Sequence, residues 1–318
     1  MVLSIILTVF NKEQYLQHVF EALLAQRKGE YELVVVNDGS SDNSLSIIEQ
    51  YAAVNPLVRV FSQQNQGLSM ARNNGVKVAI GYYVWFVDAD DEVSPESVRL
   101  ICEAAKSEPD MIPIYAKTDG IDKIRNKVAP TAKTGMDVLM GNKWEQCGVF
   151  YIFKKSFLKD NNLHFMPGVY HEDAEFTPRA LYYAKSVQVV PEILYTVYRD
   201  PNSITQIPRP KRAFDYLTVA ESLSAFVTRI GECGTRAGQV IAENVSQDIN
   251  NAFFVICQNS TDDQHELNEI FYQKRKPLLL ILSMAIQKKY HIEAFLFRLF
   301  PRRCVEVYKM MQKFNIKK

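Results

Sequence analysis

Apolar runs and amphipathic segments alternate through the first third of the chain. The nearly continuous apolar runs predict strands over 2–9, 31–37, 58–62 and 82–88. The segments between them have the spacing of amphipathic helices, over 12–25, 44–53 and 67–80. Strands of this kind are typical of parallel sheets that are covered on both faces. Strand, helix and strand in succession predict βαβ units and an open twisted sheet.

Polar residues follow three of these strands at the point where each strand ends. Asn11 follows the first strand, Asp38 the second, and the stretch Asp88-Ala89-Asp90-Asp91 the fourth. Ligands of open α/β sheets bind beyond the carboxyl ends of the strands. The pattern therefore predicts a binding site at this edge.

The pattern changes twice further along the chain. The middle is less regular, with strand-like runs over 111–116, 149–154 and 187–195. From about residue 208 the apolar positions have helical spacing and strand signals fade. The fold class is therefore α/β, an open and mostly parallel central sheet followed by a helical C-terminal region. We place a linker at 207–211, which divides the chain into 1–207 and 208–318, the first with halves 1–110 and 111–207.

Composition narrows the function classes. The 318 residues have a formal net charge of +1 and are 47% hydrophobic, so the chain can fill a core and has no overall bias toward nucleic acid. Five cysteines without CxxC spacing indicate reduced thiols rather than a zinc site. The first apolar run stops at Asn11 and is too short to span a membrane, so we expect a cytoplasmic protein.

The acidic stretch after the fourth strand suits a divalent cation. Alternation at the end of a strand puts Asp88 and Asp90 on one side and Ala89 on the other. A hard cation such as Mg²⁺ or Mn²⁺ accepts carboxylate and phosphate oxygens. The alternative is a solvated acidic turn, with Ser94 capping a helix that starts at Pro95. Separately, we expect Asp42 to cap the helix over 44–53.

Six ordered motifs resemble family 2 glycosyltransferases, inverting enzymes of the GT-A fold that use a nucleotide-activated sugar. The motifs are Ser4-Ile-Ile-Leu-Thr-Val-Phe-Asn11, Val36-Asn-Asp-Gly-Ser-Ser-Asp42, Asn65-Gln-Gly-Leu-Ser-Met-Ala-Arg-Asn73, Asp88-Ala-Asp90, Glu172-Asp173 and Tyr198-Arg-Asp-Pro-Asn-Ser203. The resemblance covers about residues 1–205 and implies a bacterial polysaccharide-type transferase of the cell envelope, adding hexosyl or N-acetylhexosaminyl groups.

The resemblance implies roles on the donor side. Asp38 would accept the imide N–H of uracil, which suits a UDP-sugar. The nucleotide-sugar site would include Thr8, Phe10, Asn11, Asp38, Arg72, Asp88, Ala89, Arg199 and Ser203. Asp90, together with Asp88, would bind Mg²⁺ or Mn²⁺. Arg199 and Ser203 would bind the leaving diphosphate, because a guanidinium offers phosphate a bidentate fork. A turn aspartate at position 38 and solvated arginines at 72 and 199 are the alternatives.

The resemblance also assigns the general base. Asp173 would take the proton of the acceptor hydroxyl, with Glu172 supporting its geometry, because an inverting transfer needs one base and forms no covalent intermediate. The alternative is that acids gather in the first turn of a helix because the helix dipole favours them. A catalytically silent protein that binds a nucleotide sugar or regulates a partner is the rival function. A nucleotidyltransferase and a dehydrogenase are disfavoured, since no glycine-rich loop follows the first strand.

The acceptor and the C-terminal end are less defined. The acceptor would be a glycan or a lipid-linked glycan, and aromatic side chains between 144 and 170 either stack on it or pack in the core. Residues 286–318 contain six lysines, three arginines and two glutamates, a net charge of +7, interleaved with apolar residues. This segment fits three alternatives: a basic amphipathic helix pair on an anionic membrane at the inner face of the plasma membrane, a core-packed helix with a solvated face, or a homodimer contact.

Overall fold

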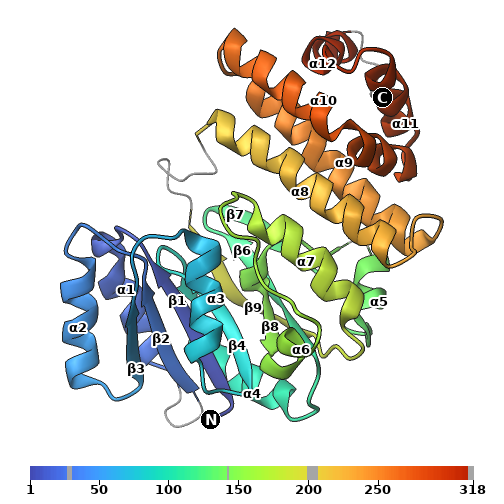
Figure 1. Ribbon diagram of the computed structural model, residues 1–318. Helices are drawn as coiled ribbons and strands as arrows, with labels where there is room; N and C mark the ends of the chain where they lie inside the picture. The colour runs from blue at the N-terminus through green and yellow to red at the C-terminus, as the bar shows by residue number, and fades with distance from the viewer. Residues whose placement is uncertain (27–30, 142, 199–206, 314–318) are drawn as a thin grey trace. The chain divides into compact units, whose positions relative to one another are not determined.

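The computed structural model describes residues 1–26, 31–141, 143–198 and 207–313 of the chain (Figure 1). Contacts divide the chain into two units. The first unit comprises Met1–Gly168 and Phe176–Arg199, and the second comprises Val169–Glu175 and Asp200–Lys318. The predicted domain boundary at 207/208 would place the short segment 169–175 with the sheet, whereas its contacts group it with the C-terminal helices.

The first unit begins with the predicted parallel strands and helices. The strands are β1 (Leu3–Val9), β2 (Tyr31–Asn37), β3 (Val58–Ser62) and β4 (Tyr83–Asp88). The helices between them are α1 (Glu13–Leu24), α2 (Ser44–Val54) and α3 (Leu68–Val78). Every residue of β1 and β2 is buried, as expected for strands covered on both faces. Helix α3 lies in front of the strands in Figure 1, and Gly75 permits this close packing, since a Cβ there would lie 2.4 Å from Ile6 Cγ2.

The sheet is mixed. The strand order is β3-β2-β1-β4-β8-β6-β9-β5, and β7 pairs with β6. The remaining strands are β5 (Glu92–Val93), β6 (Met111–Thr118), β7 (Ile121–Arg125), β8 (Tyr151–Lys154) and β9 (Val190–Val197). Strands β1 to β4 run parallel where they pair, whereas β8 is antiparallel to both β4 and β6. The α/β class with a mostly parallel nucleotide-binding half is therefore confirmed.

Shorter elements complete the first unit. They are α4 (Ser97–Ala105), α5 (Gly135–Met140), the 3₁₀ turn η1 (Gly148–Phe150), α6 (Lys155–Asp160) and α7 (Glu172–Tyr183), whose first turn belongs to the second unit. Two predicted caps are wrong in detail. Helix α4 begins at Ser97 and not at Pro95, and the N-cap of α2 is Asn43. Asp42 instead accepts hydrogen bonds from the Ser44 amide at 2.9 Å and the Glu13 amide at 3.1 Å, which ties the starts of α1 and α2 together.

The second unit is helical, as predicted. It contains α8 (Pro210–Arg229), α9 (Arg236–Ile256), α10 (Thr261–Met284), α11 (Lys288–Leu299) and α12 (Cys304–Lys313). Pro210 and Lys211 lie in α8, so the predicted linker is partly helix. An aromatic core joins three helices, with the Phe253 ring 5.1 Å from Phe297 and 5.3 Å from Tyr308.

Two expectations about the whole chain can be compared with the structure. None of the helices among the described residues has both the length and the apolar character needed to cross a membrane. All five cysteines are free thiols, and Cys102 and Cys304 are buried, in agreement with the expected reduced state.

Candidate functional site

Strand register brings the predicted donor residues to one edge of the sheet. Thr8 of β1 is paired with Asp88 of β4 and with Val36 of β2. The Asp38 amide donates to the Val9 carbonyl at 2.8 Å, which holds the residue after β2 beside the end of β1. The carboxyl ends of β1, β2 and β4 therefore form one rim, as the sequence predicts.

The loop after β1 is tied to the loop after β2. Asn11 has φ of 52°, a left-handed conformation that asparagine tolerates better than most residues. Its side-chain oxygen accepts a hydrogen bond from the Ser41 backbone amide at 2.8 Å, and its own backbone amide donates to Ser40 Oγ at 3.1 Å. Phe10, which precedes Asn11 in this loop, is 46% exposed. An exposed ring on a fixed loop is a surface on which a flat ligand can rest.

Asp38 anchors a third loop. Its Oδ1 accepts from Gln63 Nε2 at 2.7 Å and from the Gln66 amide at 2.8 Å, and its Oδ2 accepts from the Gly67 amide at 2.9 Å. The loop approaches so closely that a Cβ on Gly39 would lie 2.7 Å from the Asn65 amide nitrogen. An ionised carboxylate has about four acceptor positions. Three of these positions are used here and one on Oδ2 is not, and Asp38 is buried at 3% exposed.

Each predicted metal ligand is paired with a basic side chain. Arg72 Nη2 lies 3.0 Å from Asp88 Oδ1, and Lys12 Nζ lies 2.5 Å from Asp90 Oδ2. Arg72 is 1% exposed, and its guanidinium carbon lies 5.2 Å from the centroid of the Phe165 ring. The alternative of a solvated arginine on a helix face is therefore wrong for Arg72. Lys12 was not predicted, although its position next to Asn11 put a cation on the same rim.

Asp91 and Glu92 fasten the acidic stretch to β9. Asp91 Oδ2 accepts from the Tyr195 hydroxyl at 2.8 Å, and Asp91 Oδ1 accepts from the Tyr198 amide at 2.9 Å. Glu92 accepts from the Tyr198 hydroxyl at 2.8 Å. Burial, with the charges of Asp88 and Asp90, raises the pKa of Asp91 to about 8. Burial, the larger cause, and the neighbouring carboxylates together favour the protonated form of Asp91 at neutral pH.

The donor atoms at the rim fit a hard divalent cation in part. Asp88 and Asp90 are partly exposed and offer carboxylate oxygens, the ligands that Mg²⁺ and Mn²⁺ prefer. Among the described residues, no three His, Cys, Asp or Glu side chains are placed to hold a metal by themselves. A cation here would have to share Asp90 with Lys12 and take its other ligands from a substrate.

The first turn of α7 carries the predicted general base and packs against α8 within the second unit. The Tyr170 amide donates to Asp215 Oδ2 at 2.8 Å, and Ser222 Oγ donates to Glu175 Oε1 at 2.9 Å. Glu172 and Glu175 are buried, at 8% and 3% exposed, whereas Asp173 is half-buried. Asp173 is thus the acid of this turn that can best reach a ligand.

His171 precedes this turn in a strained position. Its φ is 64°, and its ring stacks on Tyr216 with the centroids 3.6 Å apart. Burial, and secondarily the Arg212 guanidinium, lower the pKa of His171 to about 4. Its Nε2 is buried and has no hydrogen-bond partner among the described residues, in keeping with a neutral ring. The stack of His171 on Tyr216 anchors the turn that carries Asp173.

The other predicted residues divide into three groups. Arg199 and Ser203 lie outside the described residues. Ala89 is buried at 2% exposed, beside the acids. The aromatic residues weighed for acceptor stacking are mostly core residues, since Trp144, Phe150, Tyr151 and Phe165 are all buried.

Comparisons with known proteins agree with this geometry. Residues 4–161 match the family model described as Glycosyl transferase family 2. The chain is 30% identical over 220 residues to the uncharacterized glycosyltransferase YibD of Escherichia coli strain K12, a match covering 65% of this chain and 64% of YibD. It is 33% identical over 218 residues to the uncharacterized glycosyltransferase EpsJ of Bacillus subtilis strain 168, covering 64% of this chain and 63% of EpsJ. The match thus spans slightly less than two thirds of either relative.

Solved structures share the fold. The S. aureus TarS 1–349 structure in complex with UDP-GlcNAc superposes with a TM-score of 0.80 at 19% identity, covering 99% of this chain and 92% of that chain. The mannosyltransferase PcManGT from Pyrobaculum calidifontis, in complex with GDP-Man and Mn²⁺, superposes with a TM-score of 0.51 at 13% identity, covering 98% of this chain and 87% of that chain. At these identities the likeness shows the GT-A fold followed by C-terminal helices.

Proposed function

The chain belongs, through residues 4–161, to glycosyl transferase family 2, and on this premise we propose that it is a metal-dependent inverting glycosyltransferase. It would move a hexosyl or N-acetylhexosaminyl group from a UDP-sugar to a hydroxyl of a glycan or lipid-linked acceptor. The observation that carries the proposal is the register of β1, β2 and β4, which gathers Asp38, Asp88 and Asp90 on one rim. TarS, which shares the fold, binds UDP-GlcNAc.

On the donor side, we propose that Asp38 Oδ2 accepts the imide N–H of uracil through its remaining acceptor position. Phe10 and Asn11 would border the base, with Thr8 beneath them and Ala89 beside the acids. Arg72 would hold Asp88 toward the ribose or sugar. Arg199 and Ser203 would bind the leaving diphosphate.

We propose that Asp88 and Asp90 hold Mg²⁺ or Mn²⁺ together with diphosphate oxygens. When bound, such a cation neutralises charge that develops on the leaving diphosphate. Added positive charge would suit the rim, because the charges of Asp88 and Asp90 add to burial, the larger cause, in raising the pKa of Asp91 to about 8.

The transfer itself would be a single displacement. The acceptor oxygen attacks the anomeric carbon from the face opposite the diphosphate, and the bond from that carbon to the phosphate oxygen breaks as the new glycosidic bond forms. The hydroxyl proton goes to the Asp173 carboxylate, and Glu172 supports the geometry of that turn. The leaving nucleotide departs as the diphosphate, and the configuration at the anomeric carbon is inverted.

A thermal-shift screen of UDP, GDP, CDP, dTDP and their sugars, each with and without Mn²⁺, tests the proposal. We expect stabilisation by UDP and UDP-sugars that depends on Mn²⁺, because a ligand that binds only the folded state at about 100 times its Kd adds about 2.7 kcal/mol. An equal shift with CDP would contradict the role of Asp38, since cytosine has no imide N–H. A thermal shift by UDP compounds that is the same with and without Mn²⁺ would contradict the proposed metal dependence.

A further inference from the structure

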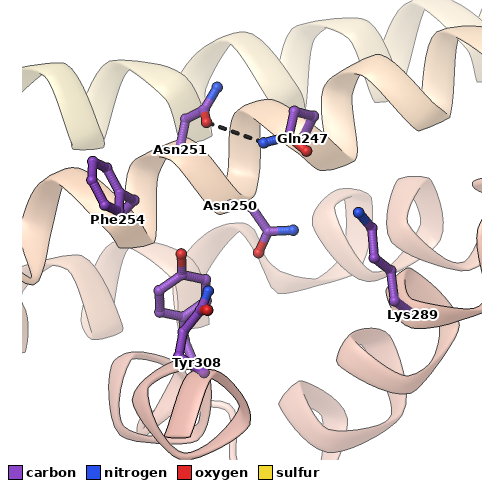
Figure 2. A pocket seen from close by; sticks show the side chains of 7 residues that line it. Gln247, Asn250, Asn251, Phe254, Lys289 and Tyr308 are labelled. Carbon is purple, nitrogen blue, oxygen red and sulfur yellow. Dashed lines mark hydrogen bonds between the residues drawn. The ribbon is translucent and has the colours of Figure 1, made fainter. Parts of the chain in front are cut away.

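The second unit has a polar pocket that the transfer reaction does not use. Its volume is about 310 Å³, and it lies between α9, α11 and α12 (Figure 2). Gln247, Asn250, Asn251 and Phe254 line it from α9. These positions are spaced i, i+3, i+4 and i+7, so they form one stripe along the helix.

This stripe is a second face of α9. The helix already buries an apolar face that includes Ile249 and Phe253. A stripe of three carboxamides and an exposed aromatic ring is not needed for that core. Phe254 is 62% exposed, whereas Asn250 is 5% exposed although its side chain is polar. The pocket therefore has a buried polar floor and an exposed aromatic rim.

The floor is built from groups with fixed orientation. Asn250 Nδ2 donates to Glu293 Oε2 at 3.2 Å, and Glu293 is fully buried on α11. Figure 2 shows the Asn250 carbonyl oxygen on the side of Tyr308, which is 5% exposed and comes from α12. Asn250 of α9 and Tyr308 of α12 thus both line the pocket with polar side chains that are nearly buried.

The rim of this pocket has donor and acceptor positions that the described hydrogen bonds do not use. Gln247 Nε2 donates to Asn251 Oδ1 at 3.2 Å, and Gln247 Oε1 accepts from the Tyr290 hydroxyl at 3.0 Å. A carboxamide has two N–H donors and two acceptor positions. One donor and one acceptor of Gln247 therefore remain for a ligand, at the side of the pocket where Lys289 also lies (Figure 2).

We propose that this pocket binds one sugar ring of a glycan. Carboxamides match hydroxyl groups because both can donate and accept. An exposed phenyl ring offers a flat apolar surface to the C–H face of a pyranose. A pocket of this volume lies near the lower limit for ligand sites, which suits a single ring.

Other ligand classes fit the lining less well. Among the described residues of the lining, Lys289 is the single cation, and its Nζ already lies 4.7 Å from the centroid of the Tyr290 ring, so a phosphate would lack a clamp. Four carboxamides, including Gln312, are too polar for an apolar ligand. A nucleobase presents its polar groups in one plane, whereas this pocket offers them from three helices and so from several sides. A sugar ring carries hydroxyls that point in several directions.

Saturation-transfer NMR on the intact chain tests the proposal. The probes are methyl glycosides of glucose, galactose and N-acetylglucosamine, with adenosine and inorganic phosphate as the other classes. We expect saturation transfer to at least one glycoside that persists in excess UDP, because none of the residues that line the pocket is among those proposed to bind the donor. This readout does not require transfer activity, so it can fail or succeed independently of the proposed function.

Phe254→Ala is the diagnostic variant, and Phe295→Ala is its matched control, because Phe295 is 61% exposed on α11 and does not line the pocket. We expect Phe254→Ala to weaken glycoside binding about tenfold and Phe295→Ala to leave it unchanged. Gln247→Ala, at another exposed position, should weaken binding as well. If no glycoside shows saturation transfer, the proposal is overturned. Unchanged binding in Phe254→Ala, or binding of adenosine or phosphate alone, would overturn it as well.

Discussion

At the rim of the sheet, two basic side chains hold the two carboxylates that we propose as metal ligands. Arg72 is buried and aims Asp88, whereas Lys12 is partly exposed and forms an ion pair with Asp90. A buried arginine at this position stays in place when a ligand binds. A partly exposed lysine can move, because its charge sits on a flexible stem. If Asp90 holds a divalent cation as proposed, Lys12 would therefore compete with that cation for Asp90.

Replacing Lys12 tests this competition. We expect Lys12→Met to bind Mn²⁺ about tenfold more tightly in the absence of nucleotide, since removal of a neighbouring positive charge is worth on the order of 1 kcal/mol or more at a partly solvated site. Titration of Mn²⁺ followed by electron paramagnetic resonance would measure the Kd. Lys77→Met, on the exposed end of α3, is the control. Weaker Mn²⁺ binding in Lys12→Met would contradict the competition.

Asp173 is tested by a nearly isosteric change. Asp173→Asn should bind UDP-sugar with unchanged affinity and lose at least about 100-fold in the rate of transfer, which is the usual contribution of a general base. Single-turnover transfer and a binding titration would separate the two effects. Asp262→Asn, in the first turn of α10, is a matched control that changes an acid at another helix start. Full activity in Asp173→Asn would assign the base to another residue.

Among the elements, those with strong local patterns were predicted best. The bounds of β2 agree with its apolar run, because a strand buried on both faces leaves a continuous apolar signal. The bounds of β3 agree as well, although only Val58 of that strand is buried. Strands β5 and β7 were missed. β5 has two residues and is formed by pairing with β9, and β7 is mostly exposed, so neither has a local pattern of its own.

The candidate site was predicted only in part. Its acids could be placed on one rim, because parallel strands end at the same edge. Their partners could not, since the pairs Arg72–Asp88 and Lys12–Asp90 join residues 16 and 78 positions apart and depend on side-chain packing. Nor did any local signal group the segment 169–175 with α8.

The contact between His171 and α8 should make stability depend on pH. The folded state keeps His171 neutral with a pKa of about 4, whereas an unfolded chain protonates histidine near pH 6.5. This contact therefore contributes fully above pH 6.5, and its contribution is lost as the pH falls toward 4, by about 3 kcal/mol in total. Urea unfolding at several pH values would measure the slope.

His171→Asn isolates that slope, because asparagine tolerates the left-handed φ but does not titrate. The variant should be less stable than the wild type at neutral pH, since the stack on Tyr216 is lost. Its stability should nevertheless fall less steeply between pH 6.5 and 4. His265→Asn, in the first half of α10, is the control. An equal slope in His171→Asn and the wild type would show that His171 is not the titrating group.

For the molecule as a whole, the described C-terminal helices bear on the three alternatives for the basic segment 286–318: a membrane surface, a core-packed helix and a dimer contact. Ile292, Phe295 and Leu299 are exposed at 42%, 61% and 55%, and they follow one another at helical spacing on α11. Basic residues at 288, 298, 302, 303 and 309 are exposed on α11, on α12 and on the turn between them. The opposite face of α11 is packed in the core, where Tyr290, Ala294 and Phe297 are buried, so the core-packed alternative holds for that face. For the exposed face we propose contact with an anionic membrane, which the positive charge favours, and a dimer contact is the alternative.

Vesicle binding separates the two. We expect the intact chain to co-sediment with vesicles that contain phosphatidylglycerol and not with pure phosphatidylcholine, because each basic residue near an anionic surface contributes about 1 kcal/mol. High salt should weaken the binding, since it screens these charges. The double variant Phe295→Ser, Leu299→Ser should bind less, whereas Phe254→Ser, equally exposed on α9, should bind as the wild type does. If the chain instead ignores both vesicle types and light scattering shows a dimer that the double variant loses, the stripe on α11 is a contact between two copies of the chain.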